Sequence, residues 1–323
     1  MSSGYLRAVA RLLIAALAMG LAAHGDPSAA EPALRVLGLR FSGVRAMKLL
    51  RRQVAMGPRV PASVPHAHTR QLIEHELGKY ADSVEEQSFL YQEGASQLPM
   101  TNIIAYMHPD APRLALVAAH YDTRPFADQD TGASRELPIP GANDGASGVA
   151  VLLELARVLS GELPDDAGVV FIFFDGEDYG HSLSTMFIGS RYFAQHLDAS
   201  LKARVDFGVL LDMIGDRDLR ILRETHSEAV AHPVFEALLE LQGALGLDVL
   251  SGSGSITIFD DHLPLNAAGL RVYDLIDFTY EPWHTQEDTP DKCSSESLHA
   301  VGLLMENLLL NFAAGNFSLR MTQ

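Results

Sequence analysis

Residues 114–122 read LALVAAHYD, a run of six apolar residues that ends in histidine, tyrosine and aspartate. An apolar run without polar alternation is typical of a strand that is buried on both faces. A second such run, VVFIFF at 169–174, ends in Asp-Gly-Glu-Asp at 175–178. Between them, residues 145–159 have the composition of a helix that begins just after Asn143-Asp144. Strands that alternate with helices in this way predict a parallel sheet.

The rest of the chain extends this alternation in both directions. We expect further strands at 86–91, 101–107, 207–211 and 272–276, and further helices at 41–55, 68–80, 190–197, 234–245 and 295–312. The predicted fold is therefore α/β, with a central mixed, mostly parallel β-sheet covered by helices on both faces. Because no repeat or linker interrupts the pattern, we expect one catalytic domain over 41–323, after a short leader at 31–40.

The first thirty residues have the features of a signal peptide. Arg7 and Arg11 precede an uncharged apolar stretch at 12–22, and small residues follow it. This stretch is shorter than the roughly 20 residues that span a bilayer. We expect export to the periplasm or medium, with no stable membrane insertion after cleavage at or before residue 30. An uncleaved anchor is the alternative.

Charge and cysteine content exclude several other classes of protein. The formal net charge is −17, and no basic stripe that would follow nucleic-acid phosphates is present, so we expect no nucleic-acid partner. Cys293 is the only cysteine, which rules out an intrachain disulfide and a cysteine-rich structural zinc site.

Polar residues stand where the predicted strands end, and ligand sites of such folds lie beyond the carboxyl ends of the strands. At the strand ends these residues are His120, Asp122, Glu177, Asp178 and Asp212. Asp144 stands at the start of the predicted helix, and His284 follows the last predicted strand. Several acids that converge there would repel one another unless a cation neutralised them. Imidazole and carboxylate ligands without cysteine suit a catalytic zinc. Taken singly, each residue also has a structural explanation: Asp144 as a helix cap, His120 as a hydrogen-bonded group, and Glu177-Asp178 as a solvated turn.

Five strings carry a more specific signal: AAHYDT at 118–123, PGANDGASGVAVLLELARVL at 140–159, FFDGEDYG at 173–180, LLDMIG at 210–215 and WHTQEDT at 283–289. In order and spacing they resemble the motifs of the zinc aminopeptidase superfamily, which also contains the animal-type glutaminyl cyclases. The resemblance runs from GPRVPAS at 57–63 to the C-terminal helix. It implies the aminopeptidase fold that this superfamily shares.

The resemblance implies two possible metal sites. Aminopeptidases of the superfamily bind two zinc ions at positions that correspond to His120, Asp144, Asp178, Asp212 and His284, with the counterpart of Glu177 as general base. Glutaminyl cyclases keep one zinc, held by the counterparts of Asp144, Asp178 and His284. The ligand types alone therefore leave both activities open.

Other stretches resemble the cyclase branch. FDDHLPLNAAGLRVYDLIDF at 259–278 is similar to the cyclase segment whose first aspartate, here Asp260, hydrogen-bonds the catalytic glutamate, and Trp283 stands before His284 as it does in cyclases. Two positions depart from the animal pattern. Asp178 stands where animal cyclases carry glutamate, and a second pocket tryptophan has no counterpart. Tyr179, His181 and Phe187 are the candidates to replace it.

The resemblance implies an enzyme that acts on peptide or protein N-termini. As a cyclase it would convert N-terminal glutamine to pyroglutamate and release ammonia, with Glu177 moving the proton, Asp260 and Asp212 supporting it, and Trp283 lining the pocket. As an aminopeptidase it would hydrolyse the first peptide bond with two zinc ions. A non-catalytic binding module would be expected to have lost Glu177 or a metal ligand, and the sequence retains them all.

Overall fold

Parallel strands form the centre of the fold in the computed structural model, which describes residues 33–320. The strands of the main sheet are, in spatial order, β1 (Ser83–Glu93), β2 (Ser96–Met107), β4 (Ala167–Phe174), β3 (Arg113–His120), β5 (Val205–Asp212) and β8 (Val272–Ile276). Neighbours from β4 to β8 pair parallel, whereas β1 with β2 and β2 with β4 pair antiparallel. The predicted mixed, mostly parallel sheet is confirmed.

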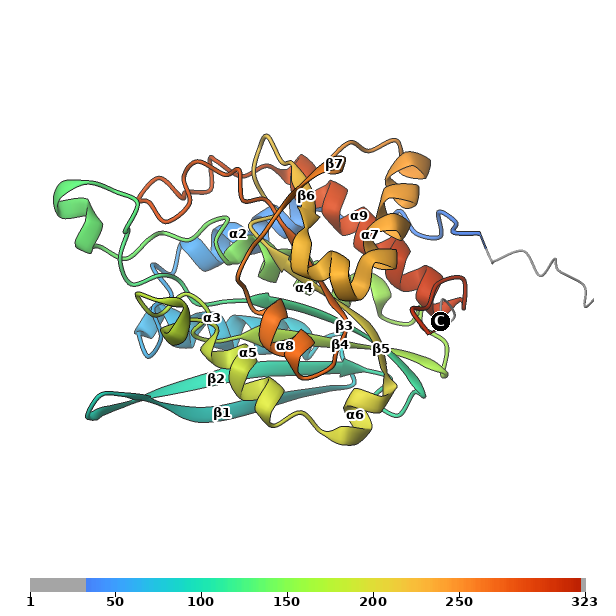
Figure 1. The fold of residues 1–323 in the computed structure, drawn as a ribbon, viewed down its shortest axis with the longest axis horizontal. Helices are drawn as coiled ribbons and strands as arrows, with labels where there is room; N and C mark the ends of the chain where they lie inside the picture. Colours follow the sequence, from blue (N-terminus) through green and yellow to red (C-terminus); the bar gives the residue numbers. More distant parts are fainter. Residues whose placement is uncertain (1–32, 321–323) are drawn as a thin grey trace, which may run out of the picture. The chain divides into compact units, whose positions relative to one another are not determined.

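Helices cover both faces of this sheet (Figure 1). The larger hydrophobic core contains residues from α2 (Gly43–Val54), α3 (Val64–Leu77), α4 (Ala146–Leu159), α7 (Thr225–Leu245) and α9 (Ser295–Ala313). A smaller core on the other face contains residues from α5 (Ile188–Gln195), α6 (Ala199–Arg204) and α8 (His262–Ala267).

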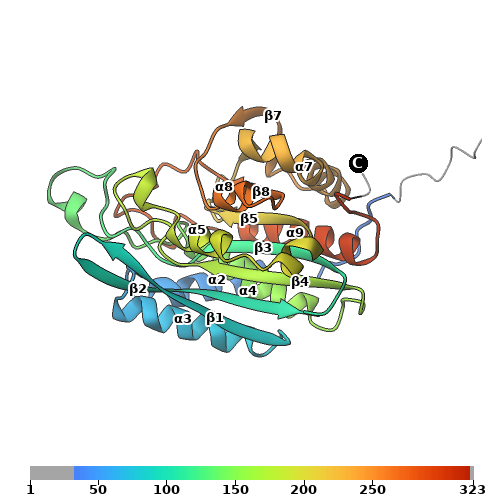
Figure 2. The same cartoon turned by 60° about the horizontal axis from the view of Figure 1, so that its bottom comes forward.

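The central strand β3 shows why the quoted stretch decides the fold. Ala115, Val117 and Ala119 contribute to the larger core, and Leu114, Leu116 and Ala118 contribute to the smaller one. Alternate residues of a strand point to opposite faces, so an unbroken apolar run feeds both cores at once. Figure 2 shows the same arrangement from below, with the long β1–β2 hairpin at the edge of the sheet.

The region between β5 and β8 departs most from the expected elements. A small second sheet pairs β6 (Ile221–Glu224) with β7 (Leu250–Ile256), and neither strand has the apolar pattern that predicts one. Helix α7 begins at Thr225 rather than at residue 234, and its backbone is non-helical at Ala231. Pro233 explains the break, because proline lacks the amide proton that a helix interior requires.

The start of the described chain bonds to the last helix. Arg35 N donates to Asn311 Oδ1 at 3.0 Å, and Arg40 N donates to Glu306 Oε1 at 3.1 Å. The predicted leader at 31–40 is thus tied to α9 from Arg35 onward, while the predicted signal peptide at 1–30 lies outside the described residues. Within the described chain, no helix has both the length and the apolar character needed to cross a membrane.

Close packing of α9 against Phe41 yields a stability prediction. A methyl group at Gly302 in α9 would overlap the Phe41 ring, whereas one at Gly243 in α7 would have no neighbour within 4 Å. Gly302→Ala should lower the melting temperature, because overpacking costs about 1–3 kcal/mol and outweighs the helix propensity gained. Gly243→Ala should raise the melting temperature, because the gain in helix propensity increases the free energy of unfolding by about 0.5–1 kcal/mol. Calorimetry on both variants checks this, and equal melting temperatures would contradict it.

Candidate metal centre

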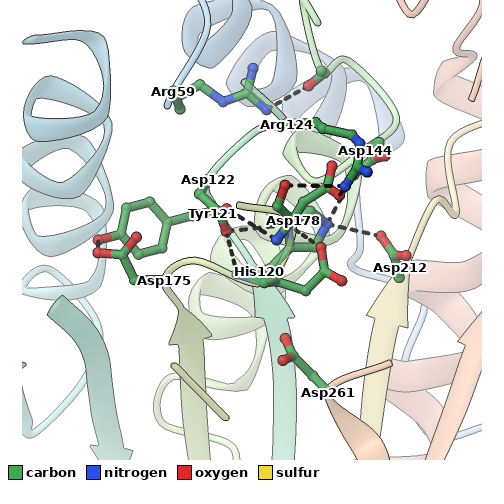
Figure 3. A network of polar contacts seen from close by, with 12 residues as sticks. Arg59, His120, Tyr121, Asp122, Arg124, Asp144, Asp175, Asp178, Asp212 and Asp261 are labelled. Atoms are coloured by element: carbon green, nitrogen blue, oxygen red, sulfur yellow. Dashed lines mark hydrogen bonds and ion pairs between the residues drawn. The ribbon is translucent and has the colours of Figure 1, made fainter. Parts of the chain in front are cut away.

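His120 ends β3 and lies between two carboxylates from neighbouring elements (Figure 3). Its Nε2 is 3.2 Å from Asp144 Oδ1 and 3.1 Å from Asp212 Oδ1. All three side chains are buried. Asp144 precedes α4 and Asp212 ends β5, so the parallel arrangement of β3 and β5 brings them to the same edge.

A second group of three shares Asp144 with the first. His284 Nε2 lies 3.7 Å from Asp144 Oδ2 and 3.3 Å from Asp178 Oδ1, and all three residues are buried. Asp178 follows β4, and His284 comes from the loop between β8 and α9. The structure therefore brings together all five residues that the resemblance implies as zinc ligands.

The second group fits a zinc ion. Asp178 Oδ2 is buried and has no hydrogen-bond partner among residues 33–320, so one carboxylate oxygen is free to take a ligand role. One imidazole nitrogen and two carboxylate oxygens match the donor types of catalytic zinc sites, which leave a position open for substrate. The first group, His120 with Asp144 and Asp212, has the same donor types and is equally compact.

Asp144 does not cap its helix. The cap position of α4 is Gly145, and no side chain caps it. A Cβ atom at Gly145 would meet the His120 ring at 2.5 Å, so a residue without a side chain is needed for the imidazole to approach Asp144. The structural explanation for Asp144 is thus wrong.

Asp122 fixes the backbone of two residues at the centre. Its Oδ1 accepts from Glu177 N at 3.1 Å and its Oδ2 accepts from Asp178 N at 3.2 Å. Both backbone amides of the Glu177-Asp178 pair are therefore fixed by one carboxylate, which excludes a solvated turn. Asp122 belongs to neither group of candidate ligands.

Asp288 fixes the backbone at Asp144 in the same way, by accepting hydrogen bonds from two consecutive amides. It accepts from Asn143 N at 2.8 Å, from Asp144 N at 3.2 Å and from Tyr280 OH at 2.7 Å. Sequence reasoning missed this role, although Asp288 lies in the WHTQEDT string. Buried Arg59, from the GPRVPAS string, anchors the same segment by donating to the Pro140 and Gly141 carbonyls.

Four of the five candidate ligands, all except His120, line an open pocket of about 280 Å³. The acidic residues of its lining are Asp128, Asp144, Glu177, Asp178, Asp212 and Asp260. The apolar residues of its lining are Leu183, Met186, Met213, Ile258, Phe259, Ile276, Phe278 and Trp283. Trp283 stacks on His284, with ring centroids 3.7 Å apart.

None of the three candidates for the missing tryptophan lines this pocket. Tyr179 OH donates to Glu93, and His181 stacks on Phe126 with ring centroids 3.8 Å apart. Phe187 is buried as the residue before α5. Their loop instead presents Leu183 and Met186, whose identity the sequence did not indicate.

Burial raises the pKa of Glu177 well above its usual range; the charge of His120 opposes this, and the charges of Asp178 and Asp260 add to it. Burial likewise raises the pKa of Asp260 well above normal, helped by Asp274 and Asp212. Both shifts favour the protonated form of the carboxyl group over the ionised form.

His262, two residues after Asp260 in the chain, is a buried histidine. His262 Nδ1 is 3.2 Å from Asp274 Oδ2, and His262 Nε2 is 3.3 Å from Glu224 Oε2. Burial alone would lower the pKa of His262, but Asp274, Glu224 and Asp260 raise it to about 10. A cation at this position offsets part of the negative charge beneath the pocket.

Comparison with known proteins gives these contacts a context. Residues 102–309 match the model of peptidase family M28. A glutaminyl-peptide cyclotransferase of the snake Boiga irregularis is 29% identical over 288 residues, which are 79% of this chain and 77% of that protein. An aminopeptidase of Bacillus subtilis is 32% identical over 209 residues, which are 61% of this chain and 40% of that protein.

Solved structures include both activities as well. The glutaminyl cyclase of Porphyromonas gingivalis superimposes with a TM-score of 0.79 at 32% identity, covering 84% of this chain and 99% of that one. A Zn-dependent exopeptidase of Parabacteroides distasonis superimposes with a TM-score of 0.78 at 28% identity, covering 84% of this chain and 98% of that one. The latter description agrees with the zinc that the donor types indicate.

The ligand assignment predicts which variants lose metal. Asp144→Ala and His284→Ala each remove one of three protein donors, so purified protein should retain little zinc, measured by mass spectrometry of the metal. Asp248→Ala and His196→Ala make the same changes at exposed positions and should keep the wild-type content. Full zinc occupancy in His284→Ala would show that the assignment is wrong.

Proposed function

Since the chain belongs to peptidase family M28, we propose that it is a zinc-dependent glutaminyl-peptide cyclotransferase, which converts the N-terminal glutamine of peptides to pyroglutamate. The observation that carries the proposal is the pair of buried carboxyl groups, Glu177 and Asp260, in one pocket. Cyclisation must move a proton from the attacking amine to the leaving amide nitrogen. Two carboxyl groups with raised pKa values are suited to that transfer.

The comparisons support the same choice. The match to cyclases extends over 79% of this chain, against 61% for the B. subtilis aminopeptidase. The chain also spans only about two-fifths of that aminopeptidase, so the activity of that whole protein is less informative.

We assign the chemical roles to residues as follows. A zinc ion held by Asp144, Asp178 and His284 would polarise the side-chain carbonyl of the substrate glutamine. Glu177 takes a proton from the α-amine as the nitrogen attacks the carbonyl carbon, and returns it to the amide nitrogen that leaves as ammonia. Asp260 would orient Glu177 by sharing a proton with it, and Asp212 would join the same network. The Trp283 ring forms a wall for the glutamine side chain.

The attack is intramolecular, so positioning supplies a large part of the rate. The apolar and acidic side chains that line the pocket would hold the glutamine in a folded conformation and exclude bulk water. Export belongs to the proposal as well, on the grounds of the basic and apolar N-terminal sequence.

An aminopeptidase is the second candidate. The observation in its favour is the group of His120, Asp144 and Asp212, which is as compact as the first and offers a second metal position. In that case Glu177 would activate water for hydrolysis of the first peptide bond. One zinc per chain is expected for the cyclase and two for the aminopeptidase.

Product analysis separates the two functions. The purified enzyme should release ammonia from a glutaminyl dipeptide and leave a pyroglutamyl peptide with its peptide bond intact, as seen by mass spectrometry. A leucyl dipeptide should remain uncleaved. Release of free leucine without any cyclisation of glutamine would overturn the cyclase proposal and support the second candidate.

The role of Glu177 predicts the effect of a nearly isosteric change. Glu177→Gln cannot accept the amine proton, so kcat should fall by about 10²–10⁴-fold while zinc content stays unchanged. Asp260→Asn should reduce kcat less, because it disturbs the orientation of Glu177 without removing it. Glu240→Gln makes the same change on the exposed side of α7 and should have no effect. Near-normal turnover by Glu177→Gln would refute the mechanism for either reaction.

A further inference from the structure

Arg124 is a buried cation at the metal centre to which the proposed reaction gives no role. It follows β3 by four residues and lines the pocket. Its Nη1 donates to Asp178 Oδ1 at 2.7 Å, and its Nη2 donates to Asp128 Oδ2 at 2.7 Å. Figure 3 shows the guanidinium beside Asp144 and Asp178. One planar group thus contacts two carboxylates at once.

Asp128 continues this chain of contacts to the histidine of the centre. Its other oxygen, Oδ1, lies 2.9 Å from His284 Nδ1. A carboxylate on one ring nitrogen of a metal-binding histidine fixes the ring orientation. The other ring nitrogen, Nε2, faces Asp144 and Asp178.

The contact with Asp178 has a matching consequence. Arg124 donates to Asp178 Oδ1, whereas Asp178 Oδ2 is buried without a partner in the described part of the chain. The guanidinium therefore sets the rotation of the carboxylate, and the free oxygen is directed by that rotation. We propose that Arg124 is a positioning residue that fixes two metal ligands, Asp178 directly and His284 through Asp128.

Stacked rings hold the guanidinium in place. Arg124 lies over the Phe126 ring, with 4.4 Å from its guanidinium carbon to the ring centroid, and His181 stacks on Phe126 in turn. A lysine at this position would keep the charge but lose the two separate nitrogen donors of the planar guanidinium. A single ammonium group cannot reproduce the positions from which Nη1 and Nη2 reach the two carboxylates. The role depends on geometry and so belongs to arginine.

Charge alone predicts the opposite effect on metal affinity. A fixed cation beside the site repels Zn²⁺, so removal of the charge would favour binding. Arg124→Lys keeps the charge and removes only the geometry, which makes it the decisive substitution. Loss of affinity in this variant can arise from misplaced ligands but not from altered charge.

Arg113 supplies a closely matched control at the opposite end of β3. Its Nη2 donates to Asp166 Oδ2 at 2.8 Å, and its guanidinium carbon lies 5.1 Å from the centroid of the Phe312 ring. It therefore combines a carboxylate contact and a ring contact, as Arg124 does. Arg113→Lys should change neither metal affinity nor the metal spectrum.

The experiment measures zinc dissociation constants by competition with a chromophoric chelator, on full-length folded protein. Arg124→Lys should weaken zinc binding by about 10–100-fold, the usual effect of losing a partner that orients a ligand. The visible absorption of the Co²⁺-substituted protein should change in Arg124→Lys, because it reports ligand geometry. Unchanged affinity and an unchanged Co²⁺ spectrum would overturn the inference.

A second variant tests the path through Asp128 and keeps the test decisive if Arg124→Lys folds poorly. Asp128→Asn should also weaken zinc binding. The double variant should lose less affinity than the sum of the two single losses, because Arg124 acts on His284 through Asp128, whereas its contact with Asp178 is separate. Wild-type affinity in Asp128→Asn, or fully additive losses, would contradict that path. The inference rests on the metal centre alone, so failure of the cyclase assay would leave these results unaffected.

Discussion

Burial of several carboxylates at one edge of the sheet is the constraint on which the rest of the structure depends. A carboxylate that leaves water is stable only where donors or cations replace its hydration. The acids at this edge include Asp122, Asp144, Glu177, Asp178 and Asp212, all buried. Backbone amides satisfy Asp122, His120 and His284 partly neutralise Asp144, and Arg124 pairs with Asp178. A bound cation would supply the charge that is still lacking.

The same hydrogen-bonding arrangement fixes the backbone of two loops that carry candidate ligands. Asp122 holds the backbone of Glu177 and Asp178, and Asp288 holds the backbone of Asn143 and Asp144. In both cases a carboxylate far away in the chain accepts two consecutive amides. Each loop is thereby fixed without the use of its own side chains, which remain free to face the pocket. The ligand geometry thus depends on acids that are not ligands.

Sequence reasoning located the candidate ligands at one edge of the sheet because the parallel arrangement makes their position simple to predict. Strands that end in polar residues deliver them to one edge, so apolar runs followed by His120, Glu177 or Asp212 suffice. It missed β6 and β7, which lack apolar periodicity, and the early start of α7, which is capped by the side chain of Glu224, a residue type that is not a usual N-cap. It also missed Arg124 and Asp128, whose roles depend on where the loop after β3 passes in space.

The same distinction bears on the choice between cyclisation and hydrolysis. The candidate metal ligands are the same for both reactions, so they carry little information about which reaction occurs. The groups that differ in their use are Asp260 and the pocket wall of Leu183, Met186 and Trp283, all from loops. Loops accept insertions and substitutions that a buried sheet does not tolerate. A fixed set of ligands can therefore serve either chemistry, and the shape of the surrounding loops decides whether an amine or a water reaches the carbonyl.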